Sequence, residues 1–373
     1  MIFFEGKSIS EEELASGELP EASPEIVYSL RICQQWMQGN TDFTINTSGS
    51  TGPAKAISLS REQLLASAKT TGDFLDYQKG ETMLVCLPTN RIGGMMQLIR
   101  AMEFGLSTSL KVTGAGRRED GEIEAGGLGS RYRPSPLERG WGEVSVEAIH
   151  TSLTPHLLYK LLAQQNGHQI LSSFKTILIG GSGVNKELKE KLSGFKNSIY
   201  QTYGMTETCS NIAMMRLSQL SEDHFKPLPG VQIAVDDDGC LRICCPATTN
   251  EWIKSNDLVQ IHNDNSFDFL GRADFVINSG GVKINPEWLE LEIATLFAGR
   301  TFMVSSKPSE VYGEEVVMVL ESIEDIDQIK LLNEIRKKVG RIHCPKKIIE
   351  VAAIPLTATH KPDRLALRTL ICG

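Results

Sequence analysis

The sequence predicts an α/β protein with a large amino-terminal domain of parallel-rich sheets and flanking helices, followed by a small, mobile α+β carboxy-terminal domain. Three observations lead to this prediction. The 373 residues are enough for two domains that each bury a core. Apolar strand-like runs alternate with helical runs over the first two thirds, as in a parallel sheet covered by helices. Beyond Gly271 the pattern changes to short strands beside one amphipathic helix.

The expected elements can be placed along the chain. They are a helix over 61–75, strands over 82–87 and 109–112 on either side of a helix over 95–104, strands over 174–179 and 240–244, and then a strand over 316–320 and a helix over 326–339. Ser60 and Gln63 have the spacing of a capping box at the start of the first helix. We place the domains at 1–271 and 272–373. The Gly- and Arg-rich stretch 113–144 predicts a solvated loop, with a functional lid as the alternative.

Composition excludes several classes of protein. A net charge of −8, with 23% charged residues, offers nucleic acid or anionic membranes no general attraction. No apolar run is long enough to span a membrane and no basic leader is visible, so we expect a cytoplasmic protein without membrane insertion. The sequence is compatible with a homodimer. The eight cysteines form no CxxC pair and the seven histidines no HxxxH pair, which predicts reduced, buried thiols and a metal that arrives with a nucleotide.

A loop rich in hydroxyls and glycines is the most informative local feature. It runs through Thr47, Ser48, Gly49, Ser50, Thr51, Gly52, Pro53, Ala54 and Lys55. Glycines let successive amides point at one anion, hydroxyls add donors and the lysine adds a charge, which together suit phosphate. The Walker loop of P-loop NTPases is excluded, because Ala54 and Ala56 stand where that motif needs glycine and Ser or Thr. A polar surface turn is the alternative on this loop alone.

Further segments decide between these interpretations. In order, they are 203–208 (YGMTET), 255–259 (SNDLV), 271–274 (GRAD) with 278–287 (NSGGVKINPE), and 359–364 (THKPDR). Together with the hydroxyl-rich loop, these motifs resemble the adenylate-forming acyl-CoA synthetase (AMP-binding) superfamily over nearly the whole chain. The sequences of segments 87–100, 210–213 and 278–283 most resemble those of o-succinylbenzoate-CoA ligases of menaquinone biosynthesis.

The resemblance implies a role for each motif. It implies ATP, Mg²⁺ and CoA as small-molecule partners of a carboxylic acid, with Lys361, Thr206 and Glu207 catalytic and Glu207 on the metal. Phosphate would be bound by Thr47, Ser48, Gly49, Ser50, Thr51, Gly52 and Lys55, and adenine and ribose by Gly181, Ser182, Gln201, Thr202, Tyr203, Asp257 and Arg272. Asp274 would be the hinge about which the small domain rotates between adenylation and thioester formation. Ser279, Gly280, Gly281 and Lys283 would line the CoA tunnel.

Arg100 suggests the kind of acid. It stands in an otherwise apolar helix face, where a cation needs an anionic partner. The second carboxylate of a dicarboxylic aromatic acid would provide one. A structural ion pair is the alternative.

Two positions depart from the pattern of the superfamily. Pro53 is followed by Ala54 rather than directly by lysine, and His360 stands where glycine is usual. Neither removes a charged group that the chemistry needs. The leading hypothesis is a ligase for o-succinylbenzoate and CoA. The alternatives are a ligase for another aryl or acyl acid or for a carrier-protein thiol, and a non-catalytic nucleotide-binding protein.

Overall fold

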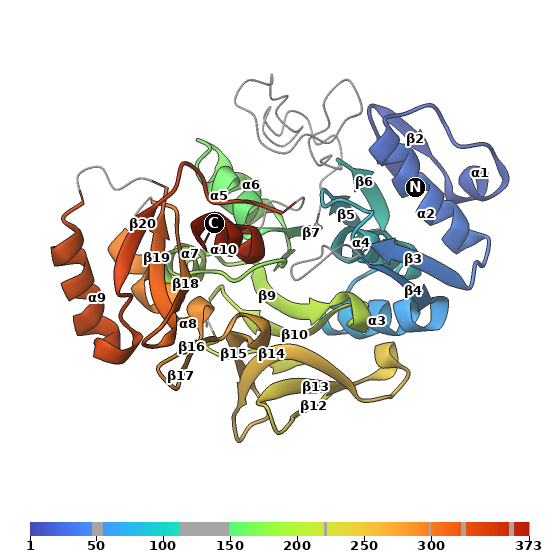
Figure 1. Ribbon diagram of the computed structural model, residues 1–373. Coiled ribbons are helices and arrows are strands. Elements are labelled where there is room, and N and C mark those ends of the chain that lie inside the picture. Colours follow the sequence, from blue (N-terminus) through green and yellow to red (C-terminus); the bar gives the residue numbers. More distant parts are fainter. Residues whose placement is uncertain are drawn as a thin grey trace. The chain divides into compact units, whose positions relative to one another are not determined.

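The fold was analysed in a computed structural model, which describes residues 1–46, 55–111, 149–219, 222–297, 300–321, 326–357 and 362–372. The described chain divides into two compact units (Figure 1). The first contains residues up to 232 together with 244–252, and the second contains 233–243 and the residues from 253 onward. The stretch 113–144 lies outside the described residues.

The first unit is built on a nine-stranded sheet with the order β11-β10-β9-β8-β7-β5-β6-β1-β2. Its strands are β1 (Ile2–Phe4), β2 (Lys7–Ile9), β5 (Thr82–Val85), β6 (Ser107–Leu110), β7 (His150–Leu153), β8 (Thr176–Ile179), β9 (Ser198–Met205), β10 (Ser210–Arg216) and β11 (Lys226–Pro227). The six strands from β9 to β1 pair in parallel, and the edges are antiparallel. All residues of β5, β7 and β8 are buried. This explains the apolar runs of β5 and β8, whereas β7 buries the polar side chains of His150, Thr151 and Ser152.

Helices and one hairpin complete this unit. They are α1 (Glu11–Ser16), α2 (Pro24–Met37), the hairpin of β3 (Asp42–Asn46) and β4 (Ala56–Ser60), α3 (Arg61–Phe74), α4 (Ile92–Glu103), α5 (Pro155–Leu162), α6 (Gly167–Ser173), α7 (Lys186–Ser193) and the one-turn helices η1 (Thr206–Thr208) and η2 (Pro246–Thr248). The predicted capping box is present, since Ser60 Oγ accepts from the Gln63 amide and Gln63 Oε1 from the Ser60 amide. α4 packs on β5, β6 and β7.

The second unit holds two sheets. The first, in the order β12-β13-β14-β15, contains β12 (Gln232–Val235), β13 (Cys240–Cys244), β14 (Ile253–Ile261) and β15 (Phe267–Arg272). The second contains β16 (Ile277–Ser279), β17 (Val282–Ile284), β18 (Phe302–Ser309), β19 (Gly313–Leu320) and β20 (Lys347–Glu350), with η3 (Ala273–Phe275), α8 (Pro286–Ile293), η4 (Ala294–Phe297), α9 (Gln328–His343) and α10 (Arg364–Cys372). The predicted domain boundary at 271/272 falls at the end of β15 and stays a prediction.

Both faces of the sheet around β19 are covered. Val316, Met318 and Leu320 belong to one apolar core, with residues of α8 and α9, whereas Val317 and Val319 belong to another, with residues of α10. Alternate residues of a strand point to opposite faces, so a strand covered on both sides is apolar throughout. The predicted strand 316–320 and helix 326–339 are therefore present, and the α/β prediction is confirmed.

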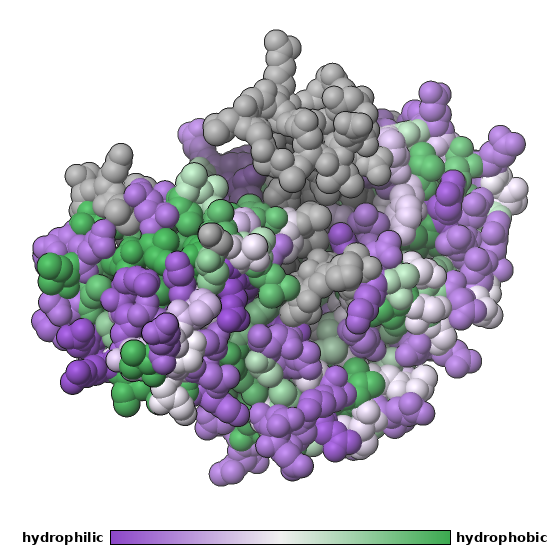
Figure 2. Space-filling view, in the orientation of Figure 1, coloured by the Kyte–Doolittle hydropathy of each residue, from purple (hydrophilic) through white to green (hydrophobic). Residues whose placement is uncertain are grey.

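The polarity of the surface and the burial of most cysteines agree with the predictions made from composition. Over the described part of the face drawn in Figure 2, hydrophilic residues alternate with smaller hydrophobic groups. No described helix has the length and apolar character needed to cross a membrane. All eight cysteines are free and seven are buried. Cys372 is the exception to the prediction of buried thiols, because it lies exposed in the last turn of α10.

Candidate functional site

The hairpin β3–β4 flanks the predicted phosphate loop. Asn46 ends β3 and pairs with Ala56 at the start of β4, and the Arg91 guanidinium donates to the Asn46 carbonyl at 3.0 Å. Lys55 is exposed immediately before β4. The remaining predicted phosphate ligands, Thr47, Ser48, Gly49, Ser50, Thr51 and Gly52, lie outside the described residues with Pro53, Ala54, His360 and Lys361.

The turn after β9 carries Thr206 and Glu207. Both lie in η1, where Thr208 Oγ1 accepts a hydrogen bond from the Met205 amide at 3.0 Å. The Cys209 amide donates to the Thr206 carbonyl, also at 3.0 Å. Glu207 is exposed. Its carboxylate therefore lies open at the carboxyl end of a parallel strand, which is where open α/β sheets bind ligands.

The loop after β8 lies beside Thr202 of β9. Thr202 Oγ1 donates to the carbonyl of Ile179, the last residue of β8, at 3.2 Å. A Cβ on Gly180 would stand 2.8 Å from that hydroxyl, and Gly181 has a φ of 90°, so both positions favour glycine. Gly181 and the following Ser182 are exposed. Their backbone is thus accessible at the predicted strand end, while adenine binding there stays a prediction.

Neighbouring residues of β9 point to opposite faces of the sheet. Gln201 and Tyr203 are buried at 8% and 9% exposure, whereas Thr202 between them is half-buried. The Tyr203 ring packs against Phe225, with 5.8 Å between the ring centroids. The resemblance to the superfamily had placed these three together at the adenine and ribose. The pleat separates Thr202, which lies beside Gly180, from the other two.

Arg100 is buried on α4 at 2% exposure. Its Nη2 donates to Asn211 Oδ1 at 2.6 Å, and its Nε has no hydrogen-bond partner among the residues that the structure describes. Burial lowers the pKa of Arg100 to about 10, with a small opposing effect of Tyr77. Among the described residues no carboxylate forms an ion pair with it, so the structural ion pair that was the alternative for Arg100 is not found there.

In the second unit, Asp257 of β14 pairs with Arg272 of β15. Their positions are opposite in the register, and Arg272 Nη1 lies 3.3 Å from Asp257 Oδ1. Arg272 Nη2 lies 2.5 Å from Asp274 Oδ2, and Asn256 Nδ2 donates to the same carboxylate at 3.1 Å. Burial by itself would lower the pKa of Arg272, because it disfavours the charged form. The hydrogen bond to Asp274 and the negative charge of Asp257 outweigh this effect, so the pKa of Arg272 is raised. The predicted ribose residues and the predicted hinge therefore form one cluster.

The predicted CoA residues form the tight turn between β16 and β17. Ser279 pairs with Val282, and the two residues between them, Gly280 and Gly281, have φ of 59° and 82°. A two-residue hairpin with both φ values positive strongly favours glycine. Lys283 follows, exposed, on β17. The turn geometry explains the two glycines, and their contact with CoA stays a prediction.

Sequence reasoning missed an ion pair at the start of α10. Arg364 Nη2 lies 2.5 Å from Glu290 Oε2, and the Val304 amide donates to Glu290 Oε1 at 2.7 Å. Burial raises the pKa of Glu290, against the opposing charge of Arg364. Arg364 is three residues after Lys361. The pair has no sequence signal because 74 residues separate its members.

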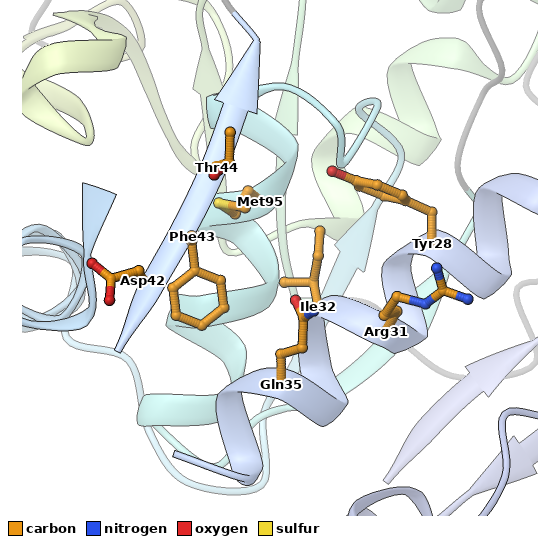
Figure 3. Close-up of a pocket in the computed structure, with 8 residues that line it drawn as sticks. All are labelled: Tyr28, Arg31, Ile32, Gln35, Asp42, Phe43, Thr44 and Met95. Carbon is orange, nitrogen blue, oxygen red and sulfur yellow. The ribbon is translucent and has the colours of Figure 1, made fainter. Parts of the chain in front are cut away.

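A hollow of about 280 Å³ in the first unit was also missed (Figure 3). Its lining consists of Tyr28, Arg31, Ile32, Gln35, Asp42, Phe43, Thr44 and Met95. Ile32, Phe43 and Met95 are buried, and Figure 3 shows the Arg31 guanidinium extending away from β3. α2 contributes four of these residues, and this helix was not among the elements predicted from the sequence.

Comparison with known proteins gives the family. The family model described as AMP-binding enzyme matches residues 131–248. A solved structure, described as an acyl-CoA synthetase (AMP-forming)/AMP-acid ligase II-like protein from Dyadobacter fermentans, is 31% identical, with 97% of this chain and 99% of that chain covered and a TM-score of 0.61. The chain belongs to the AMP-binding enzyme family. The predicted superfamily is confirmed.

Other relatives of this AMP-binding enzyme have more specific names. A 2-succinylbenzoate–CoA ligase of Staphylococcus epidermidis is 25% identical in an alignment of 348 positions that covers 87% of this chain and 68% of that protein. One of Listeria monocytogenes is 24% identical over 97% of this chain and 75% of its own length. The structure of o-succinylbenzoate coenzyme A synthetase (MenE) from Bacillus subtilis with ATP and magnesium ion has a TM-score of 0.71 at 22% identity, covering 87% of this chain and 69% of that one, and shows a shared fold.

The described residues of this AMP-binding enzyme fit a magnesium nucleotide. Glu207 offers an exposed carboxylate, the donor type that Mg²⁺ prefers. The Gly181 backbone is exposed at the end of β8, where open α/β sheets bind ligands. The Asp257 carboxylate is buried and paired with Arg272. Glu207 and Gly181 belong to the first unit and Asp257 to the second.

Proposed function

We propose that this protein is an ATP-dependent acid–thiol ligase that converts o-succinylbenzoate to its acyl-adenylate and then to o-succinylbenzoyl-CoA, a step of menaquinone biosynthesis. One observation carries the proposal: relatives matched over 87% and 97% of the chain are named 2-succinylbenzoate–CoA ligases. The sequence resemblance of segments 87–100, 210–213 and 278–283 to such ligases supports the proposal independently of the fold.

In this reaction, the predicted catalytic, hinge and CoA-tunnel residues would each have a distinct physical role. Bound Mg·ATP supplies the adenylyl group and a pyrophosphate leaving group. Glu207 would hold the metal through its exposed carboxylate, and the Thr206 hydroxyl would donate to the α-phosphate. Lys361 would stabilise the negative charge that develops during adenylation. The hinge at Asp274 would then exchange Lys361 for the turn of Gly280 and Gly281, which leaves room for the pantetheine arm.

Arg100 would receive the second carboxylate of the acid. The guanidinium is buried, holds a single described hydrogen bond at Nη2, and keeps Nε unused. An anionic group that reached it would gain a charge-assisted bond in a dry environment. We therefore expect Arg100→Ala to lower kcat/KM for a diacid far more than for a monocarboxylate. Equal losses on both kinds of acid would remove the substrate role of Arg100.

The direct test is pyrophosphate release with ATP and magnesium over a panel of acids. The panel contains o-succinylbenzoate, benzoate and acetate, each with and without CoA. The proposal predicts turnover with the diacid and thioester formation that depends on CoA. Release with a monocarboxylate would indicate another acyl-CoA ligase. Adenylation without CoA transfer would indicate a carrier-protein thiol as acceptor.

A further inference from the structure

The turn that carries Thr206 and Glu207 has a strained exit. Cys209 has a φ of 52° and Ser210 a φ of 88°, and neither is glycine. Non-glycine residues adopt positive φ at an energetic cost and keep it only where surrounding contacts hold them. Part of the support comes from the turn itself, since Thr208 Oγ1 donates to the Ser210 carbonyl at 2.7 Å. Two further contacts come from outside the turn.

The first contact comes from Ser67 on α3. Ser67 Oγ donates to the Cys209 carbonyl at 2.6 Å. Ser67 is 4% exposed and Cys209 is fully buried. Water cannot replace a hydrogen bond in such a place, so removal of the hydroxyl would leave the carbonyl unsatisfied.

The second contact holds the residue after Ser210. Asn211 Nδ2 donates to Thr71 Oγ1 at 3.0 Å, while Arg100 Nη2 fixes the other end of the same amide at 2.6 Å. Thr71 and Ser67 are four residues apart on α3 and so lie on one face of the helix. One helix face thus binds the chain on both sides of Ser210.

We propose that Ser67 and Thr71 are positioning residues that aim Thr206 and Glu207 at the magnesium nucleotide. The inference rests on the proposed function, since it needs Glu207 to serve the metal. The hydroxyls touch neither metal nor nucleotide in this account. They hold the strained pair Cys209–Ser210, and the η1 hydrogen bonds carry that constraint back to Glu207.

The test compares Ser67→Ala and Thr71→Val with a matched control, Thr151→Val. Thr151 is equally buried and its hydroxyl donates to the Leu84 carbonyl at 3.0 Å, within the sheet. We expect the two α3 variants to need roughly tenfold more Mg²⁺ for half-maximal pyrophosphate release. Thioester formation from supplied acyl-adenylate should change less than about twofold, and Thr71→Ser should restore the Mg²⁺ dependence.

Calorimetric titration of ATP at several Mg²⁺ concentrations separates this inference from the proposed function. It measures nucleotide binding even if no acid in the panel turns over. Mg²⁺-dependent binding that weakens in Ser67→Ala and Thr71→Val, but not in Thr151→Val, supports the positioning role. Unchanged Mg²⁺ dependence, equal losses in both half-reactions that follow thermal stability, or no Mg²⁺-dependent binding by the unmodified protein would overturn it.

Discussion

The Arg100→Met variant tests whether the buried guanidinium of α4 is held without a carboxylate. Methionine keeps most of the side-chain volume and removes the charge. Burial lowers the pKa of Arg100 to about 10, which corresponds to roughly 3 kcal/mol of cost for burying the cation. Removing it leaves Asn211 Oδ1 without its 2.6 Å bond, at a cost of about 1–3 kcal/mol. The two effects offset, and we expect the free energy of unfolding to change by less than about 2 kcal/mol.

Arg364→Met is the matched control. Its guanidinium forms the two-bonded pair with Glu290, so the same substitution leaves a carboxylate that is only 19% exposed without its cation. We expect a loss of about 3–5 kcal/mol there. Urea unfolding measures both changes, and hydrogen exchange in α4 and α10 assigns each one to its own unit. A loss as large for Arg100→Met as for Arg364→Met would show that Arg100 has a carboxylate partner and would refute the reasoning.

Three further predictions concern the chemistry and the pH dependence. Lys361→Ala should abolish adenylate formation and leave thioester formation from supplied acyl-adenylate nearly intact, because negative charge develops at the α-phosphoryl group only in the first step; loss of both half-reactions would contradict this. Asp257→Asn should raise the KM for ATP by roughly tenfold, because the carboxylate would accept hydrogen bonds from both ribose hydroxyls. Steady-state kinetics measures this change, and an unchanged KM would contradict the ribose role of Asp257. Burial lowers the pKa of His150 below its ordinary value of 6.5 despite the bond to Glu81, so the unfolded chain binds the proton more readily. Stability to urea should therefore fall as the pH drops from about 7 to about 5, and a His150→Phe variant with the same slope would argue against this cause.

Secondary structure could be predicted where one physical signal dominated. The Ser60 and Gln63 side chains fixed the start of α3, and unbroken apolar runs indicated β5 and β8 because both of their faces are covered. Ends were less accurate. The helix predicted over 95–104 begins earlier, at Ile92. Gly93 and Gly94 are poor helix formers, so no pattern in the sequence indicated its first turn. The structure explains Gly94, because a Cβ there would stand 2.3 Å from the Pro88 carbonyl oxygen.

The site could be predicted only as far as motifs reach. Motif order led to Asp257, Arg272 and Asp274, which the second unit brings into one cluster. It reached Arg364 at the end of the last motif but not its pairing with Glu290, because a pair of charges far apart in sequence has no local pattern. Nor could the sequence assign Thr202 and Tyr203 to opposite faces of β9, because the pleat that separates these neighbours is a property of the strand.

The same limit explains why Ser67 and Thr71 were not predicted. In sequence they are ordinary hydroxyls in a helix interior, where such residues usually bond to their own backbone. Their partners belong to a different segment, more than a hundred residues away, and the reason for the contact is a backbone conformation that sequence does not display. A motif names the groups that meet the nucleotide. The accuracy with which those groups are aimed depends on residues elsewhere in the fold, and for Glu207 we propose that these are Ser67 and Thr71 of α3.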